Sequence, residues 1–126
     1  MPTPNPAAFE FLLNRRSCPA KTLTTPTPDR EVLLQLLTAA ARTPDHGKLE
    51  PWRFIVVDHA AMAPLAALAQ ECGEAAALEP EQITKGRAQF DQGNLAVVVV
   101  EVQKPSTKVP ALEQTYSAGA VGLALV

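Results

Sequence analysis

Residues 42–52 crowd five charged or titratable side chains into one short segment, which reads Arg-Thr-Pro-Asp-His-Gly-Lys-Leu-Glu-Pro-Trp. Pro44 and Pro51 hold its ends extended, because proline fixes its own φ angle and restricts the residue before it. A stiff, charged loop between two buried elements is a favourable place for a binding site, since the scaffold fixes its position. The segment therefore indicates a binding site without naming the ligand.

A second chemically suggestive group, Arg15, Arg16 and Ser17, follows a predicted helix over residues 7–14. Cations at the C-terminus of a helix interact favourably with the helix dipole, which contributes about 0.3–1 kcal/mol. Alternatively, two guanidinium groups and a hydroxyl form a cradle for a phosphate, because each guanidinium can donate two parallel hydrogen bonds. Spacing alone leaves both explanations open.

His46 has a simple explanation as well, because a lone loop histidine more often faces solvent or stabilises a turn than binds a ligand. Asp45, His46 and Ser17 are the residue types of a hydrolase triad, but the sequence has no nucleophile elbow. Cys18 and Cys72 lie far apart and lack a metal-binding spacing. The sequence therefore predicts neither a hydrolase triad nor a metal site.

The elements that must position these residues follow from the hydrophobic periodicity. In the helix over residues 7–14, Phe9, Leu12 and Leu13 are spaced for burial. The later predicted elements are a Thr/Pro linker over 21–28, a strand over 52–57, helices over 61–72 and 81–90, a strand over 95–102, and a helix from Leu112. The unbroken apolar run of the second strand is typical of a strand covered on both faces.

The helix before the charged loop is the best-specified element. Thr27 is the expected N-cap, with Pro28 at the first helical position, and Pro44 ends the helix. Its apolar stripe consists of Val32, Leu33, Leu36, Leu37, Ala40 and Ala41. The order of elements predicts an α+β or α/β domain with helices over both sheet faces. Two strands are too few for a stable sheet, so the missing strands are expected from an absent C-terminal part, from another chain, or from segments of this chain assigned here to other structure.

Composition limits the function. The 126 residues are 47% hydrophobic with a net charge of -2, which suits one domain, expected over residues 7–126 after a disordered lead over residues 1–6. The eleven cations are scattered, so we expect no nucleic-acid partner. No apolar run is long enough for a membrane span, and the few cysteines favour the cytoplasm. The apolar, uncapped run over residues 118–126 predicts a C-terminally truncated chain.

Several motifs in order resemble the nitroreductase family of FMN flavoproteins, specifically its small bacterial NAD(P)H nitroreductase branch. The motifs are Arg15-Arg16-Ser17, Arg42-Thr-Pro-Asp-His46, Glu50-Pro51-Trp52, Lys108-Val-Pro110, Glu113-Gln and Ser117-Ala-Gly119. The resemblance implies an α+β sandwich with a mixed or antiparallel sheet and helices on both faces, incomplete at the C-terminus. It also implies a homodimer with FMN in clefts that the two subunits share.

The resemblance assigns the cofactor-binding positions. Arg15, Arg16 and Ser17 would hold the FMN phosphate and ribityl chain, and Arg42 and His46 would reach the flavin, partly from the partner subunit. The implied reaction passes hydride from NAD(P)H through flavin N5 to a small-molecule acceptor such as a nitro compound or quinone. Because the cofactor supplies this chemistry, the resemblance implies no catalytic protein residue.

The sequence also departs from the family pattern. Glu50 stands where the family commonly has Gln, and Pro19 replaces a phosphate-binding cation of some members. The C-terminal part that completes the flavin site in the family is missing. A non-catalytic truncated relative, or an interaction module without a productive flavin site, is therefore the alternative.

Overall fold

The computed structural model describes residues 3–126. Its elements in chain order are α1 (Pro6–Asn14), the 3₁₀ turn η1 (Ala20–Thr22), α2 (Arg30–Ala40), the 3₁₀ turn η2 (His46–Lys48), β1 (Trp52–Val57), α3 (His59–Ala75), α4 (Pro80–Asp91), β2 (Ala96–Glu101) and α5 (Ala111–Ala124). Helices around an antiparallel strand pair make this an α+β fold, which confirms the predicted class.

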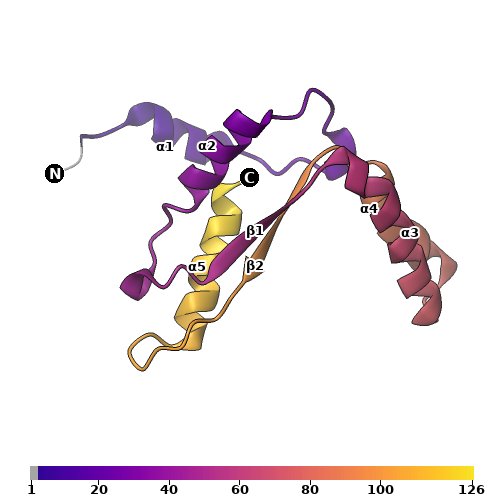
Figure 1. The fold of residues 1–126 in the computed structure, drawn as a ribbon. Helices are drawn as coiled ribbons and strands as arrows, with labels where there is room; N and C mark the ends of the chain where they lie inside the picture. Colours follow the sequence, from indigo (N-terminus) through magenta and orange to yellow (C-terminus); the bar gives the residue numbers. More distant parts are fainter. Residues whose placement is uncertain (1–2) are drawn as a thin grey trace.

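The two strands form a ribbon that connects two groups of helices. β1 and β2 pair antiparallel, with Trp52 opposite Glu101 at one end and Val57 opposite Ala96 at the other. The α3–α4 hairpin lies at the Val57 end, whereas α2 and α5 lie near the other end (Figure 1). The ribbon thus separates the charged loop, which precedes Trp52, from the α3–α4 hairpin.

A helix cap, a glycine and a hydrogen bond between the helices stabilise the α3–α4 hairpin. The Asp58 carboxylate accepts a hydrogen bond from Ala61 N at 3.1 Å and caps α3, and Asp is one of the favoured N-cap residues. Gly73 lets α4 approach closely, because a Cβ at this position would lie 2.9 Å from Ile83 Cγ1. Arg87 then joins the two helices by donating to Gln70 Oε1 at 2.7 Å.

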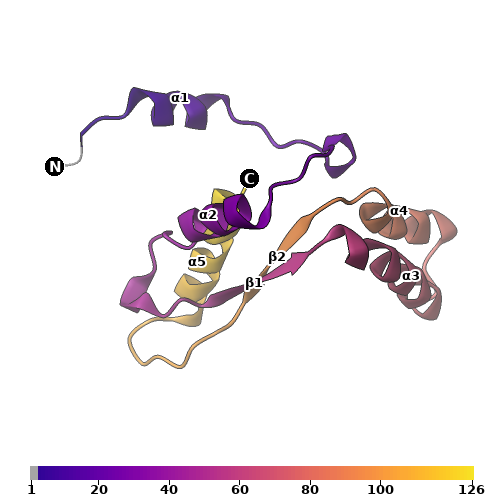
Figure 2. The same ribbon diagram turned by 45° about the horizontal axis from the view of Figure 1, so that its top comes forward.

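The start of α2 differs from its prediction. Asp29, not Thr27, is the N-cap, since its Oδ1 accepts a hydrogen bond from Val32 N at 2.9 Å. Both residue types cap helices well, and the carboxylate two residues later has the geometry that satisfies the free N–H. α2 packs beside α5 (Figure 2) and buries Ala40 completely. Of the predicted stripe, Val32 and Leu36 remain exposed.

α1 forms as predicted but does not bury its apolar face. Asn5 caps the helix by accepting from Ala8 N at 3.1 Å. Figure 2 shows α1 apart from α2 and α5, and none of its residues is buried. The predicted burial of its apolar side chains is therefore wrong, because no described element packs on them; they are Phe9 (65% exposed), Leu12 (68%) and Leu13 (61%). Of the predicted disordered lead, residues 1–2 lie outside the described residues, whereas Asn5 and Pro6 form the N-cap and first residue of α1, so the prediction is wrong there.

β2 is covered less than its apolar sequence predicts. α5 packs against this strand, yet Val98 is 45% exposed. Exposed and half-buried residues largely alternate along the strand, which is typical of a sheet with one covered face. The core consists mainly of small side chains from several elements: Ala40, Met62, Ala66, Val109, Ala118 and Val121. Within residues 3–126, no helix is both long and apolar enough to cross a membrane.

Candidate functional site

The charged loop between α2 and β1 is tightly constrained. Asp45 closes it, because its Oδ2 accepts a hydrogen bond from Glu50 N at 2.6 Å. Three loop residues adopt left-handed backbone conformations, namely Gly47 (φ 77°), Lys48 (φ 51°) and Glu50 (φ 47°). Such conformations are unfavourable for Lys and Glu and persist only where the surroundings enforce them. The loop is therefore a rigid support for its side chains.

The first half of α5 and the segment before it hold this loop in place. Ser117 Oγ donates to Pro44 O at 3.4 Å. The backbone of Gly47 passes so close to Val109 that a Cβ on the glycine would lie 3.2 Å from Val109 Cγ2. These contacts join residues more than sixty positions apart, and sequence periodicity gives no sign of them.

His46 is paired within the chain. Its Nδ1 lies 2.7 Å from Glu113 Oε2 in the first turn of α5, and both side chains are largely exposed. The structure therefore places this candidate flavin contact on the loop surface, against a carboxylate that sequence reasoning did not assign to the site. The only sequence signal for Glu113 was its place in the Glu113-Gln motif.

A polar depression of about 500 Å³ lies beside the loop. Arg42 contributes to it, whereas His46 does not, and its full lining is Ala41, Arg42, Thr43, Asp45, Lys48, Glu50 and Trp52. The Oδ1 atom of Asp45 is buried without a hydrogen-bond partner. With two cations and two carboxylates around it, the depression suits a ligand that carries both donors and acceptors.

The arginine pair and Ser17 follow α1 and lie outside this depression. Arg15 is half-buried and its Nε is enclosed without a partner, whereas Arg16 and Ser17 are exposed. Neither arginine forms a salt bridge among the described residues. Neither of the two cavities lined by Arg42 includes Arg15, Arg16 or Ser17. Within one chain, the five predicted cofactor-binding residues thus fall into separate groups.

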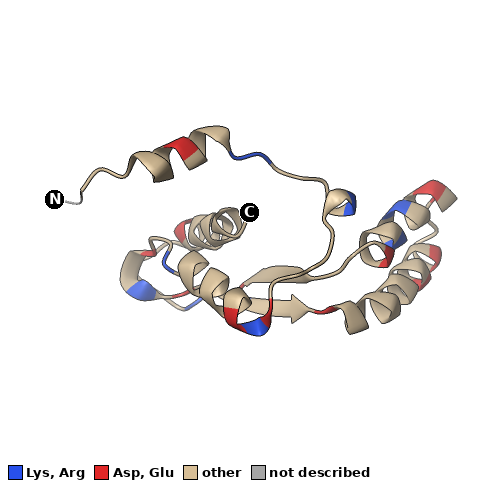
Figure 3. Ribbon diagram, turned by 90° about the horizontal axis from the view of Figure 1, so that it is seen from above, with Lys and Arg blue, Asp and Glu red and all other residues tan. Residues whose placement is uncertain are grey.

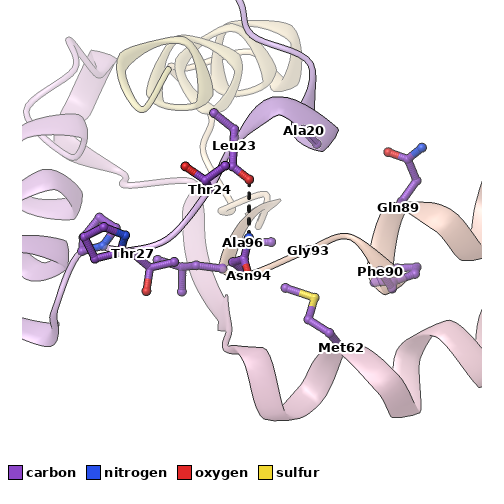
Figure 4. Close-up of a pocket in the computed structure, with 13 residues that line it drawn as sticks. Ala20, Leu23, Thr24, Thr27, Met62, Gln89, Phe90, Gly93, Asn94 and Ala96 are labelled. Carbon is purple, nitrogen blue, oxygen red and sulfur yellow. Dashed lines mark hydrogen bonds between the residues drawn. The ribbon is translucent and has the colours of Figure 1, made fainter.

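An apolar cavity of about 460 Å³ lies elsewhere, between the Thr/Pro linker and the α3–α4 hairpin (Figure 4). Leu23 and Thr24 line it from the linker, with Met62 and Phe90 on the helical side. Asn94 Nδ2 donates to Leu23 O at 3.4 Å across its edge. No charged side chain lines this cavity, so it does not suit a phosphate group.

The charges of the chain do not gather on one face. Lys and Arg segments and Asp and Glu segments both occur in several separate parts of the fold, and both signs lie on α2 and α4 (Figure 3). One basic stretch follows α1, where Arg15 and Arg16 lie. In residues 3–126, no group of three or more His, Cys, Asp or Glu side chains could hold a metal ion.

Comparisons with known proteins agree on one family. The family model described as "Nitroreductase family" matches residues 12–125. A protein of Escherichia coli (strain K12) named "Putative NAD(P)H nitroreductase YdjA" is 35% identical over 118 residues. A protein of Haemophilus influenzae named "Putative NAD(P)H nitroreductase" is 34% identical over 113 residues. The alignments cover 94% and 89% of this chain, but only 63% and 60% of the relatives' lengths.

A solved structure supports the fold. The crystal structure of the nitroreductase-like family protein from Bacillus cereus superposes with a TM-score of 0.72 and covers 99% of this chain and 64% of its own. The two sequences are 21% identical, so this likeness shows the fold alone. The predicted nitroreductase-like architecture is thereby confirmed.

Proposed function

The chain belongs to the nitroreductase family, and from this premise we propose that it is an FMN-dependent NAD(P)H oxidoreductase. The proposed reaction passes hydride from NAD(P)H through the flavin to a nitro compound, a quinone or a similar small acceptor. The names of the two bacterial relatives support the nicotinamide donor. Bound FMN would supply the hydride chemistry, so the side chains of this chain act by binding and orienting.

One observation carries the proposal. The group formed by Arg15, Arg16 and Ser17 has hydrogen-bonding capacity that no described residue uses, since Arg15 Nε is buried without a partner and the arginines form no salt bridge. A dianionic phosphate is the ligand that such a donor set matches, because guanidinium groups give short, charge-assisted hydrogen bonds. These residues therefore fit the phosphate end of FMN.

The charged loop would provide the second part of the site. Arg42 lines the polar depression, and His46 lies on the same loop with its side chain 62% exposed. Because Arg15, Arg16 and Ser17 share neither of Arg42's cavities, we place the loop contacts with the flavin partly across a dimer interface. In this arrangement the loop of one subunit and the arginine pair of its partner would bind the same cofactor.

A homodimer would also account for α1. Four large apolar side chains of this helix are more than half exposed, which is unusual for a helix without a partner; they are Phe9, Phe11, Leu12 and Leu13. Burial of this face against a second copy would remove apolar surface from water and would place Arg15 at an interface. The exposed face is support for the proposed dimer.

The experiment is flavin binding by the full 126-residue chain. We expect a yellow protein, or uptake of added FMN followed through quenching of flavin fluorescence, and bleaching of the flavin absorbance when NADH or NADPH is added without oxygen. Size-exclusion chromatography with light scattering checks the dimer in the same sample. A colourless protein that does not take up FMN would favour the alternative, a non-catalytic relative or an interaction module.

A further inference from the structure

The contact between His46 and Glu113 fixes which ring nitrogen of the histidine carries hydrogen. Nδ1 of His46 lies 2.7 Å from Glu113 Oε2. An ionised carboxylate only accepts hydrogen bonds, so Nδ1 must be the donor. In the neutral ring, a hydrogen on Nδ1 leaves a lone pair on Nε2. The contact therefore selects one of the two neutral tautomers.

Nε2 is then the ring nitrogen that remains for a bound molecule. No hydrogen bond within the described residues involves it, and the His46 side chain is 62% exposed. In the neutral ring Nε2 accepts a hydrogen bond, and in the protonated ring it donates one. The loop thus presents one chemically defined nitrogen at its surface.

Glu113 is well placed to impose this choice because its own position is fixed. It lies in the first turn of α5, where the helix dipole favours a carboxylate. Its neighbour Gln114 is 2% exposed and hydrogen-bonded to the backbone of Lys104, which anchors this turn. On the other side, Ser117 and Val109 hold the loop through Pro44 and Gly47.

We propose that Glu113 is a positioning residue for His46: it holds the imidazole as the Nδ1–H tautomer and directs Nε2 away from α5, toward a molecule bound against the loop. The identity of that molecule as FMN rests on the proposed function. The tautomer itself is a property of the protein without ligand. The same geometry predicts that Glu113 affects ligand binding only through the imidazole.

A merely structural ion pair is the competing explanation. Exposed ion pairs contribute little to stability, and an acid in the first turn of a helix is favourable without any partner. The chain offers a matched control for both effects: Glu81 lies in the first turn of α4 and pairs with Lys85 at 2.7 Å. Glu81→Ala removes a carboxylate of the same type, far from His46.

The deciding measurement is nitrogen-15 NMR of the imidazole rings in the full chain without flavin, recorded across a pH series so that the spectra of the neutral rings can be compared. His59 serves as the internal reference. We expect the Nδ1–H tautomer for His46 in the wild type and in Glu113→Gln, whose amide oxygen still accepts. In Glu113→Ala the ratio of Nδ1–H to Nε2–H should fall at least threefold, while Glu81→Ala should leave it unchanged. An unaltered tautomer in Glu113→Ala would overturn the proposal.

A second measurement uses FMN as the probe. Glu113→Ala should weaken FMN binding by roughly threefold to tenfold, and should have no further effect in a His46→Ala background. Equal losses in both backgrounds would show that Glu113 acts independently of the imidazole and would overturn the positioning role. If the wild-type chain does not bind FMN, the proposed function fails, whereas the tautomer measurement still decides the role of Glu113.

Discussion

Gln114 binds the backbone of Lys104 through both ends of its amide. Its Oε1 accepts from Lys104 N at 2.8 Å, and its Nε2 donates to Lys104 O at 2.9 Å. The side chain thus satisfies both the backbone N–H and the backbone C=O of Lys104, as a neighbouring strand would. It thereby attaches the segment after β2 to α5. Because Gln114 is 2% exposed, water cannot easily replace it.

Replacement of Gln114 by Ala should therefore destabilise the fold. The variant loses two hydrogen bonds, for which we expect a decrease of about 1–3 kcal/mol in the free energy of unfolding. Urea denaturation followed by circular dichroism measures the change. Gln35→Ala, an exposed position on α2, is the control and should stay within about 0.5 kcal/mol. Equal stability of the two variants would show that the hydrogen bonds between Gln114 and Lys104 do not stabilise the fold.

The arginine–serine group should dominate FMN affinity. Arg15→Ala combined with Ser17→Ala removes several charge-assisted hydrogen bonds, each worth about 1.5–3 kcal/mol. Fluorescence titration should show FMN binding at least roughly a hundredfold weaker. Arg30→Ala, at an exposed cation on α2, is the control and should bind FMN normally. An unchanged affinity in the double variant would place the phosphate elsewhere.

The two helical glycines of the α3–α4 hairpin should respond in opposite ways to alanine. At Gly73 a Cβ would lie 2.9 Å from Ile83 Cγ1, so Gly73→Ala should lower the free energy of unfolding by about 1–3 kcal/mol. At Gly86 a Cβ would meet no atom within 4 Å apart from the neighbouring backbone of α4, so Gly86→Ala should raise the free energy of unfolding by roughly 0.5–1 kcal/mol. Thermal unfolding of both variants tests the close approach of the helices, and changes of the same sign would contradict it.

The N-cap of α2 can be located by a pair of substitutions. Asp29→Ala removes the acceptor for Val32 N and should cost about 0.5–2 kcal/mol of unfolding free energy. Thr27→Ala should cost less than about 0.5 kcal/mol, because its hydroxyl caps nothing. Chemical denaturation of the two variants measures both changes in the free energy of unfolding. A larger loss of unfolding free energy in Thr27→Ala than in Asp29→Ala would show that Thr27 is the N-cap, as the sequence predicts.

Local chemistry predicts much of this fold from sequence. The first strand has the predicted ends, Trp52 and Val57, because β-branched and aromatic residues are bounded there by Pro51 and Asp58. The cap at Asp58 follows from the same kind of local rule. The start of α2 shows the limit: Thr27 and Asp29 are both good caps, and only the three-dimensional geometry selects one.

The sequence pattern could not predict contacts between residues that lie far apart in the sequence. Periodicity identifies the apolar face of α1 but does not say whether anything covers it, so the expected burial of Phe9 was wrong. It likewise could not place Glu113 beside His46, because 67 residues separate them. The motif order indicates the family, yet only the fold shows that neither cavity lined by Arg42 includes Arg15, Arg16 or Ser17.

The strand ribbon has a consequence for behaviour at high concentration. Among the described residues, β1 and β2 pair only with each other, so each strand leaves one row of backbone groups unpaired. Such edges are templates for association with further strands. Charged Arg53 and Glu101, both exposed near one end of the ribbon, oppose this edge-to-edge growth. Neutral replacements at these two positions would favour aggregation through the sheet.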